Sequence, residues 1–214
     1  MLERTFSKDR QSPTDGHFIG RTARGHHRAL SVTMMAATIL ASITSQARTG
    51  EAYTHYGLQY GFDHFRQSME LYIPNESCGP TPLAIYIHGG GWLTGNAEQG
   101  SQYVDNLVKR GFAVASFNYR FSQHQIYPAQ IQDCKGAVRY LRANAARYNL
   151  DVENFGVFGD SSGGHLAALL GSTGGVASLE GQVGGNIALS SRVQAAVDIY
   201  GPTDLFACAD DGFL

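Results

Sequence analysis

The segment Gly159-Asp-Ser161-Ser-Gly163 has the residue types that a nucleophile for acyl transfer needs. Glycines stand two residues before and two residues after Ser161, which is the G-x-S-x-G spacing of a sharp turn between a strand and a helix. The serine of such a turn is held in strained backbone angles, and the glycines remove side chains that would collide there. The spacing therefore predicts Ser161 as the nucleophile. The alternative interpretation is an ordinary helix cap.

A second glycine-rich motif, His88-Gly-Gly-Gly91-Trp92, follows a short apolar run. Three consecutive glycines, including Gly89, allow the backbone to turn its N–H groups into a cleft. Preorganised donors of this kind stabilise the oxyanion of acyl transfer by about 3 kcal/mol each. Alone, the motif is also typical of a tight loop. Because it precedes Ser161 by about seventy residues, and each motif supplies what the other lacks, the pair predicts a serine hydrolase site.

Alternating elements are predicted around the two motifs. Apolar runs indicate strands over residues 69–73, 83–87, 112–117, 155–158 and 193–200, and spacings of three and four indicate helices over 101–110, 128–148 and 163–170. Gly111 is placed to adopt a left-handed conformation after the first helix, and residues 171–191 are expected to form a surface loop with little regular structure. This order predicts an α/β fold with a mostly parallel, doubly wound sheet, in which sites gather beyond the carboxyl ends of the strands.

Residues 70–205 resemble the α/β-hydrolase fold, in particular the hormone-sensitive-lipase-like esterases and the feruloyl and acetyl-xylan esterases. The resemblance rests on the two motifs with Gly95 and Gly164, on Asn118-Tyr-Arg120, and on the segment Asp198–Asp204. It implies an oxyanion hole formed by the backbone N–H groups of Gly90, Gly91 and Ser162. It also implies a structural role at the site for His88, Gly89, Trp92, Gly159 and Gly163.

The general base is not predicted within this sequence. In this fold the nucleophile is followed by the acid and then by the histidine, but only His165 follows Ser161, and the helix carries it away from the hydroxyl. The triad Asp and His, with the C-terminal part of the fold, are therefore expected beyond Leu214, and the 214 residues alone are expected to have low or no activity. The remaining acidic residues and histidines are interpreted as structural, turn or surface groups, namely Asp133, Asp160, Asp204, His55, His64 and His124.

Composition limits the possible partners. The chain has 16 basic and 18 acidic residues, a formal charge of −2, so neither a nucleic acid nor a membrane surface is expected to bind it. A small ester is expected as substrate, with no cofactor. The three cysteines have neither metal-ligand nor redox spacing, so no metal is predicted. Cys134 is expected to pack as a small hydrophobic residue, whereas a Cys78–Cys208 disulfide is left open, as is the oligomeric state.

The first 47 residues are predicted to be a signal peptide with a basic leader, and residues 48–214 a partial hydrolase domain. Arg21, Arg24 and Arg28 precede the apolar run 29–43, which ends in the small-x-small pattern Ser45-Gln-Ala47. The run is shorter than the roughly twenty residues of a transmembrane helix, so a secreted or periplasmic protein without a membrane span is expected. A disordered tail, or an extension before a start at Met34 or earlier, is the alternative.

The sequence thus predicts a serine carboxylic ester hydrolase. Small acyl esters, on plant polysaccharide, are the substrates that the resemblance and the leader suggest together. Two alternatives remain open. One is a binding module that keeps the pocket without the triad histidine, and the other is a serine peptidase of the same fold.

Overall fold

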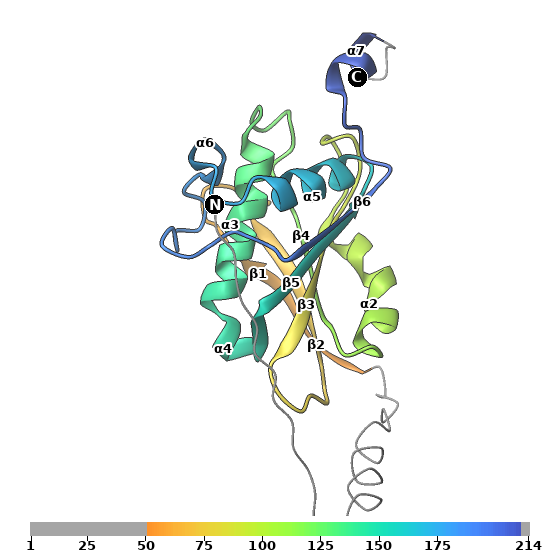
Figure 1. The fold of residues 1–214 in the computed structure, drawn as a ribbon, viewed down its shortest axis with the longest axis vertical. Coiled ribbons are helices and arrows are strands. Elements are labelled where there is room, and N and C mark those ends of the chain that lie inside the picture. The colour runs from red at the N-terminus through yellow and green to blue at the C-terminus, as the bar shows by residue number, and fades with distance from the viewer. Residues whose placement is uncertain (1–50, 211–214) are drawn as a thin grey trace, which may run out of the picture. The chain divides into compact units, whose positions relative to one another are not determined.

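A computed structural model describes residues 51–210, so the predicted leader over residues 1–47 lies outside the described part. The described chain forms a six-stranded sheet in the order β1-β2-β4-β3-β5-β6 (Figure 1). The strands are β1 (Ala52–Gln59), β2 (Ser68–Pro74), β3 (Thr81–Ile87), β4 (Ala113–Phe117), β5 (Leu150–Asp160) and β6 (Ala195–Ile199). Each strand expected from the apolar runs is present, and β1 is an additional one.

Strand direction divides the sheet into two parts. β1 pairs with β2, and β2 with β4, in antiparallel fashion, whereas β4, β3, β5 and β6 run parallel. β3 and β4 are buried along almost their whole length, as is typical of parallel strands covered on both faces. The predicted α/β class with a mostly parallel sheet is therefore confirmed.

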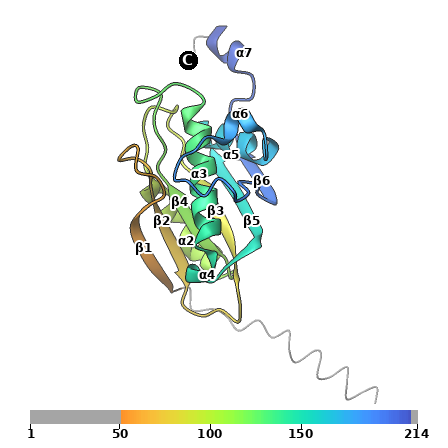
Figure 2. The same ribbon diagram turned by 90° about the vertical axis from the view of Figure 1, so that its left-hand side faces the viewer.

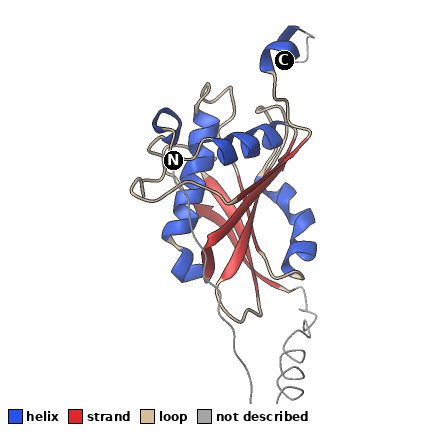
Figure 3. Cartoon of the chain, in the orientation of Figure 1, coloured by secondary structure: helices blue, strands red, loops and turns tan. Residues whose placement is uncertain are grey.

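Helices cover both faces of the sheet (Figures 1 and 3). On one face lie α3 (Ala129–Ala143), α4 (Ala145–Tyr148) and α5 (Ser162–Ser172), with the short α6 (Ala177–Glu180) beside α3. The main core lies between this layer and the strands. On the other face the 3₁₀ turn η2 (Ala97–Gly100) leads into α2 (Ser101–Val108), which packs on β2 and β4 in a smaller apolar cluster. Gly111 follows α2 with φ +87°, as predicted.

The helix predicted over residues 128–148 is divided at Asn144. The Asn144 side-chain amide donates to the Tyr140 carbonyl at 2.9 Å, and its backbone leaves helical angles at φ −103° and ψ 11°. Asparagine disturbs helices in this way because its side chain competes for backbone groups. α3 therefore ends at Ala143, and the separate turn α4 follows.

The loop over residues 171–191 is more ordered than its composition indicates. Lys135 and Arg139 of α3 are buried, and both bind the carboxylate of Glu180 in α6, at 2.8 and 3.1 Å. Arg139 also donates to the carbonyls of Gly181 and Val183. Buried cations require such partners. The two cations of α3 therefore fix the course of a Gly- and Ser-rich segment in which apolar spacing gives no signal.

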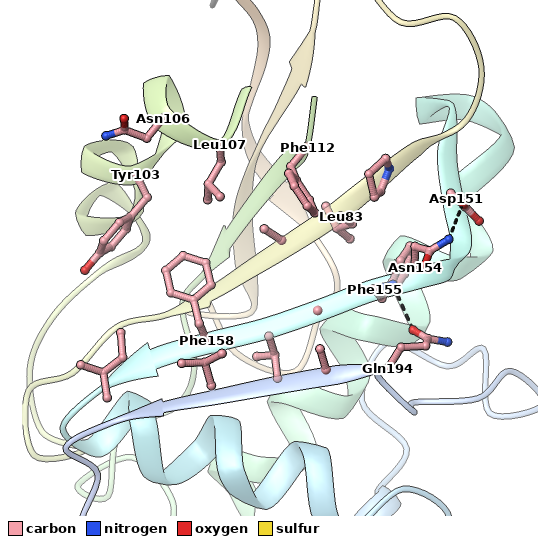
Figure 4. Close-up of a pocket in the computed structure, with 17 residues that line it drawn as sticks. Leu83, Tyr103, Asn106, Leu107, Phe112, Asp151, Asn154, Phe155, Phe158 and Gln194 are labelled. Carbon is pink, nitrogen blue, oxygen red and sulfur yellow. Dashed lines mark hydrogen bonds between the residues drawn. The ribbon is translucent and has the colours of Figure 1, made fainter. Parts of the chain in front are cut away.

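An apolar groove of about 710 Å³ lies on the face of the sheet that carries α2 (Figure 4). β3, β5 and β6 form its floor, and Tyr103 and Leu107 of α2 line one side. On β6, Val197 is 55% exposed. The two faces thus differ, because α3, α4 and α5 lie on one of them and α2 covers only part of the other (Figure 2).

The cysteines and the helices give two smaller findings. Cys134 is fully buried in the main core, as expected, and all three cysteines are free thiols. Cys78 precedes β3 and Cys208 lies in α7 (Leu205–Asp210) beyond β6, so the two stand at opposite ends of parallel strands.

Among the described residues, no helix has the length and apolar character needed to cross a bilayer.

Candidate active site

Ser161 is the single residue that connects β5, which ends at Asp160, to α5, which begins at Ser162. Its backbone has φ +52° and ψ −124°, a conformation that residues other than glycine rarely adopt. The Ser161 N–H donates to the carbonyl of Ile199 at the end of β6, at 3.0 Å. Strain of this kind is retained where the surrounding structure enforces it, and it concentrates at functional sites. The local geometry is that of a nucleophile elbow.

Glycines allow α5 to begin directly against the end of β3. A Cβ atom on Gly163 would lie 2.6 Å from the His88 carbonyl oxygen and closer still to that of Ile87. A Cβ atom on Gly159 would also come 2.6 Å from the Ile87 carbonyl oxygen. Real Cβ atoms essentially never come so close to backbone oxygens. The spacing recognised in the sequence therefore has a packing cause, and it places the two motifs side by side.

The loop after β3 passes beside Ser161. A Cβ atom on Gly89 would lie 3.3 Å from the Ser161 Cβ. Gly90 and Gly91 are exposed, with φ +114° and +61°. Within residues 51–210, the backbone N–H groups of Gly90, Gly91 and Ser162 donate to no other backbone carbonyl. Three N–H groups without a backbone acceptor thus lie on the two segments that meet at Ser161.

His88 holds this loop by a hydrogen bond from its buried side chain. Its imidazole is fully buried and stacks on Tyr119, with ring centroids 4.4 Å apart and planes 15° apart. Nδ1 lies 2.7 Å from the Gly89 carbonyl, so Nδ1 carries the proton and donates. Burial lowers the pKa of His88 to about 4, and the ring is neutral at pH 7. A buried imidazole with this hydrogen bond holds the loop in place and has no access to a substrate.

Arg66, from the loop between β1 and β2, joins His88 to the next loop. Its Nε donates to the Tyr119 carbonyl at 2.7 Å, and one terminal nitrogen lies 3.0 Å from the Gly95 carbonyl and 3.4 Å from His88 Nε2. The guanidinium carbon lies 3.6 Å from the centroid of the Phe121 ring. Sequence reasoning missed Arg66 because no motif surrounds it. Its role depends on contacts between segments far apart in the chain.

Asp160, the residue before the nucleophile, accepts a hydrogen bond from the Tyr86 hydroxyl at 2.5 Å. Burial and the Asp160 carboxylate raise the pKa of Tyr86, so this hydroxyl remains a donor. A Cβ atom on Gly89 would lie 2.6 Å from the other Asp160 oxygen. The carboxylate therefore lies against the loop after β3 and binds Tyr86 of β3, which agrees with the structural role expected for it.

The remaining acidic residues and histidines have structural contacts. Asp133 forms a bidentate ion pair with Arg120, and Asp204 accepts the N–H groups that begin α7. The His165 ring packs edge-to-face on Trp92, with centroids 5.4 Å apart, and burial lowers its pKa. Within residues 51–208, no carboxylate or imidazole hydrogen-bonds the Ser161 hydroxyl.

A cavity of about 190 Å³ lies one helical turn from Ser161. It is lined by Trp92 of the loop after β3, by Tyr127 and Gln130 near the start of α3, by His165 and Leu166 of α5, and by Ser122 and Leu205. Gln130 is buried, and its amide donates to the Gln125 carbonyl at 2.7 Å. The wall is mostly apolar with a few polar groups, which is the usual composition of a small-molecule site.

Sheet order, the strained serine elbow after a parallel strand and the glycine loop after β3 together define an α/β-hydrolase. The chain belongs to the BD-FAE family, which matches residues 69–212. A truncated form of a carbohydrate esterase from gut microbiota is 37% identical, with a TM-score of 0.68 over 74% of this chain and 60% of that one. A bifunctional GH43-CE protein of Bacteroides eggerthii is 38% identical, with a TM-score of 0.67 over 71% of this chain and 21% of that one.

Among curated proteins, the esterase LipC of Mycobacterium tuberculosis is 35% identical over 126 residues, which are 58% of this chain and 31% of LipC. The esterase of Gibberella moniliformis is 36% identical over 89 residues, which are 41% of this chain and 28% of that protein. The chain thus spans about a third or less of the curated relatives that it matches.

Proposed function

We propose that this protein is a serine carboxylic ester hydrolase that acts on acyl esters of carbohydrates. The observation that carries the proposal is the strained Ser161 backbone, at φ +52° and ψ −124°, beside a loop with unpaired N–H groups. The carbohydrate part is supported by similarity to two solved structures, those of a carbohydrate esterase and of a bifunctional GH43-CE protein. The family membership supports the class of reaction.

In the proposed reaction, the Ser161 oxygen attacks the ester carbonyl carbon and its proton passes to a base. The carbonyl oxygen becomes an oxyanion, which accepts hydrogen bonds from the N–H groups of Gly90, Gly91 and Ser162. Collapse of the intermediate breaks the bond to the alcohol, which leaves with that proton, and water then hydrolyses the acyl-serine. Since residues 51–208 offer the Ser161 hydroxyl no base, the histidine and its acid would have to come from outside them, as the motif order predicts.

The nucleophile can be tested with the protein expressed from its intact gene. A phosphonate ester should modify Ser161, and Ser161→Ala should abolish both the modification and the hydrolysis of an aryl acetate. Ser162→Ala is the matched control, because Ser162 is buried and its backbone N–H is retained. It should keep the adduct at Ser161. An adduct on Ser162, or hydrolysis that survives in Ser161→Ala, would overturn the assignment.

We also propose that the protein is exported and that residues 1–47 are removed. The proposal is supported by the basic residues before the apolar run 29–43 and by the small residues Ser45 and Ala47. Amino-terminal sequencing of protein from an intact secreting host should read Arg48 first. A cytoplasmic product that still begins at Met1 would contradict export.

A further inference from the structure

Two loops lie at the carboxyl end of the sheet, close to the site (Figure 2). One is the loop between β1 and β2, with His64 and Phe65, and the other is the loop after β4, with His124 and Tyr127. Phe65 is 75% exposed and Tyr127 is 56% exposed. We call His64, Phe65 and His124 the aromatic shelf. The loop that contributes His124 also contributes Tyr127 and Ser122 to the cavity near Ser161, so the shelf continues the site outward.

The rings of the shelf pack against one another. The His64 ring lies 4.4 Å from Phe65 and 4.6 Å from His124, centroid to centroid. His124 stacks on Phe121, with planes 16° apart, and Phe121 lies under the Arg66 guanidinium. The rings therefore form a column. Arg66, at one end of this column, also donates a hydrogen bond to the Gly95 carbonyl in the loop after β3. A surface that is ordered in advance loses little conformational entropy on binding.

Hydrogen bonds fix which imidazole nitrogens can bind a ligand. Nδ1 of His64 accepts the N–H of Arg66, and Nδ1 of His124 accepts the N–H of Phe121, both at 3.2 Å. Each neutral ring therefore carries its proton on Nε2, which makes no hydrogen bond to another described residue. Burial and the neighbouring His124 lower the pKa of His64, so its ring is neutral at pH 7. Metal binding through Nε2 would require each ring to change tautomer and would break its Nδ1 hydrogen bond.

A ligand for this surface must combine a flat apolar face with many hydroxyl acceptors. A sugar ring does so, because its axial C–H groups pack on an aromatic face while its hydroxyls lie around the rim. An acyl chain or an apolar peptide would leave the two Nε2–H donors without partners, which costs binding energy. We propose that the aromatic shelf binds the sugar chain of the ester substrate while the acyl-bearing residue lies at Ser161. This inference rests on the proposed function and deepens it.

Affinity electrophoresis of the protein from its intact gene, in gels containing soluble arabinoxylan, tests the shelf without turnover. The polysaccharide should retard the wild type, and Phe65→Ser should weaken the apparent affinity about tenfold. His124→Ala should weaken it to a similar degree, whereas Phe65→Trp should retain it because the flat ring is kept. Tyr53→Ser is the matched control, since Tyr53 is 69% exposed but lies on β1 away from the shelf, and its retardation should equal that of the wild type.

Modification of Ser161 by a phosphonate ester is measured on the same samples. A wild type that is modified at Ser161 but not retarded would overturn the shelf and leave the esterase proposal intact. A wild type that is retarded but never modified would instead contradict the esterase. Retardation unchanged in Phe65→Ser would place the polysaccharide elsewhere. If Phe65→Ser abolished concentration-dependent self-association and left retardation unchanged, the shelf would be a contact between two copies of the chain.

Discussion

The elbow around Ser161 and the loop after β3 are both rich in glycine, but they lie in different surroundings. Gly163 is buried at the start of α5, and a Cβ atom there would meet the backbone oxygens of Ile87 and His88. Gly91 is exposed, and a Cβ atom there would have no neighbour within 4 Å, but its φ is +61°. The first glycine is required by close packing and the second by the backbone angle.

This difference separates two properties of the site. The elbow is fixed by backbone that cannot move without displacing β3 or α5, so its geometry is a consequence of the fold. The loop after β3 is held by hydrogen bonds from two side chains, those of His88 and Arg66, and its outer surface is exposed. We therefore expect substitutions in the elbow to reduce the stability of the whole domain, and substitutions in the loop to have smaller effects on stability.

The largest expected effect is that of Gly163→Ala. The added methyl group would lie 2.6 Å from the His88 carbonyl oxygen, and it can be accommodated only if α5 moves away from β3. Overpacking against backbone should lower the free energy of unfolding by about 3 kcal/mol or more. Urea unfolding followed by far-UV circular dichroism measures the change.

Gly156→Ala is the control for this substitution. Gly156 lies in β5, and the nearest atom to an added Cβ would be the Ala195 Cβ at 3.8 Å, an ordinary contact. Because alanine also restricts the unfolded chain, this variant should be neutral or slightly more stable. If the two variants lost the same stability, the close approach at Gly163 would not explain its glycine.

A second, pH-dependent effect is expected from His88. Burial lowers the pKa of His88 to about 4 in the folded protein, from about 6.5 in the unfolded chain. The unfolded state therefore binds a proton first on acidification. The stabilisation due to the neutral ring is complete above pH 6.5 and is lost as the pH falls to 4, by up to about 3 kcal/mol. Urea unfolding between pH 7 and pH 4.5 should show this decline.

His88→Gln tests the assignment, because glutamine keeps a donor for the Gly89 carbonyl and does not titrate. The variant should be about 2 kcal/mol less stable at pH 7, since it loses the stacking on Tyr119. Its stability should then fall less steeply than that of the wild type between pH 6.5 and 4.5. Parallel slopes in the two proteins would show that another group causes the decline.

The parts of the site that the sequence predicted are those fixed by local spacing. Strand runs, the position of Gly111 and the turn at Ser161 depend on residues a few positions apart, and the structure has them where expected. β1 was missed because Ala52–Gln59 mixes exposed tyrosines with half-buried residues and has a register shift between His55 and Leu58. Neither feature gives the regular alternation that indicates a strand.

The contacts that the sequence did not predict join residues far apart in the chain. Arg66 and the Gly95 carbonyl are 29 positions apart, and Lys135 and Glu180 are 45 apart. No local sequence pattern around a half-buried arginine predicts that it will bind distant backbone carbonyls. Likewise, the pair of rings formed by His64 and His124 depends on two loops that meet only after the sheet has formed.

The smallest effect is expected for Gly91→Ala. The side chain has free space, so the only cost is that of holding alanine at φ +61°, about 1 kcal/mol. Asparagine tolerates this region better than alanine does, and Gly91→Asn should therefore lose about half as much. Urea unfolding of the two variants beside Gly163→Ala gives the comparison directly. Since the Gly91 N–H is kept in both, the rate at which a phosphonate ester modifies Ser161 should change less than about threefold. A loss for Gly91→Ala as large as that for Gly163→Ala would mean that the loop is packed as tightly as the elbow, and the distinction between the two glycines would fail.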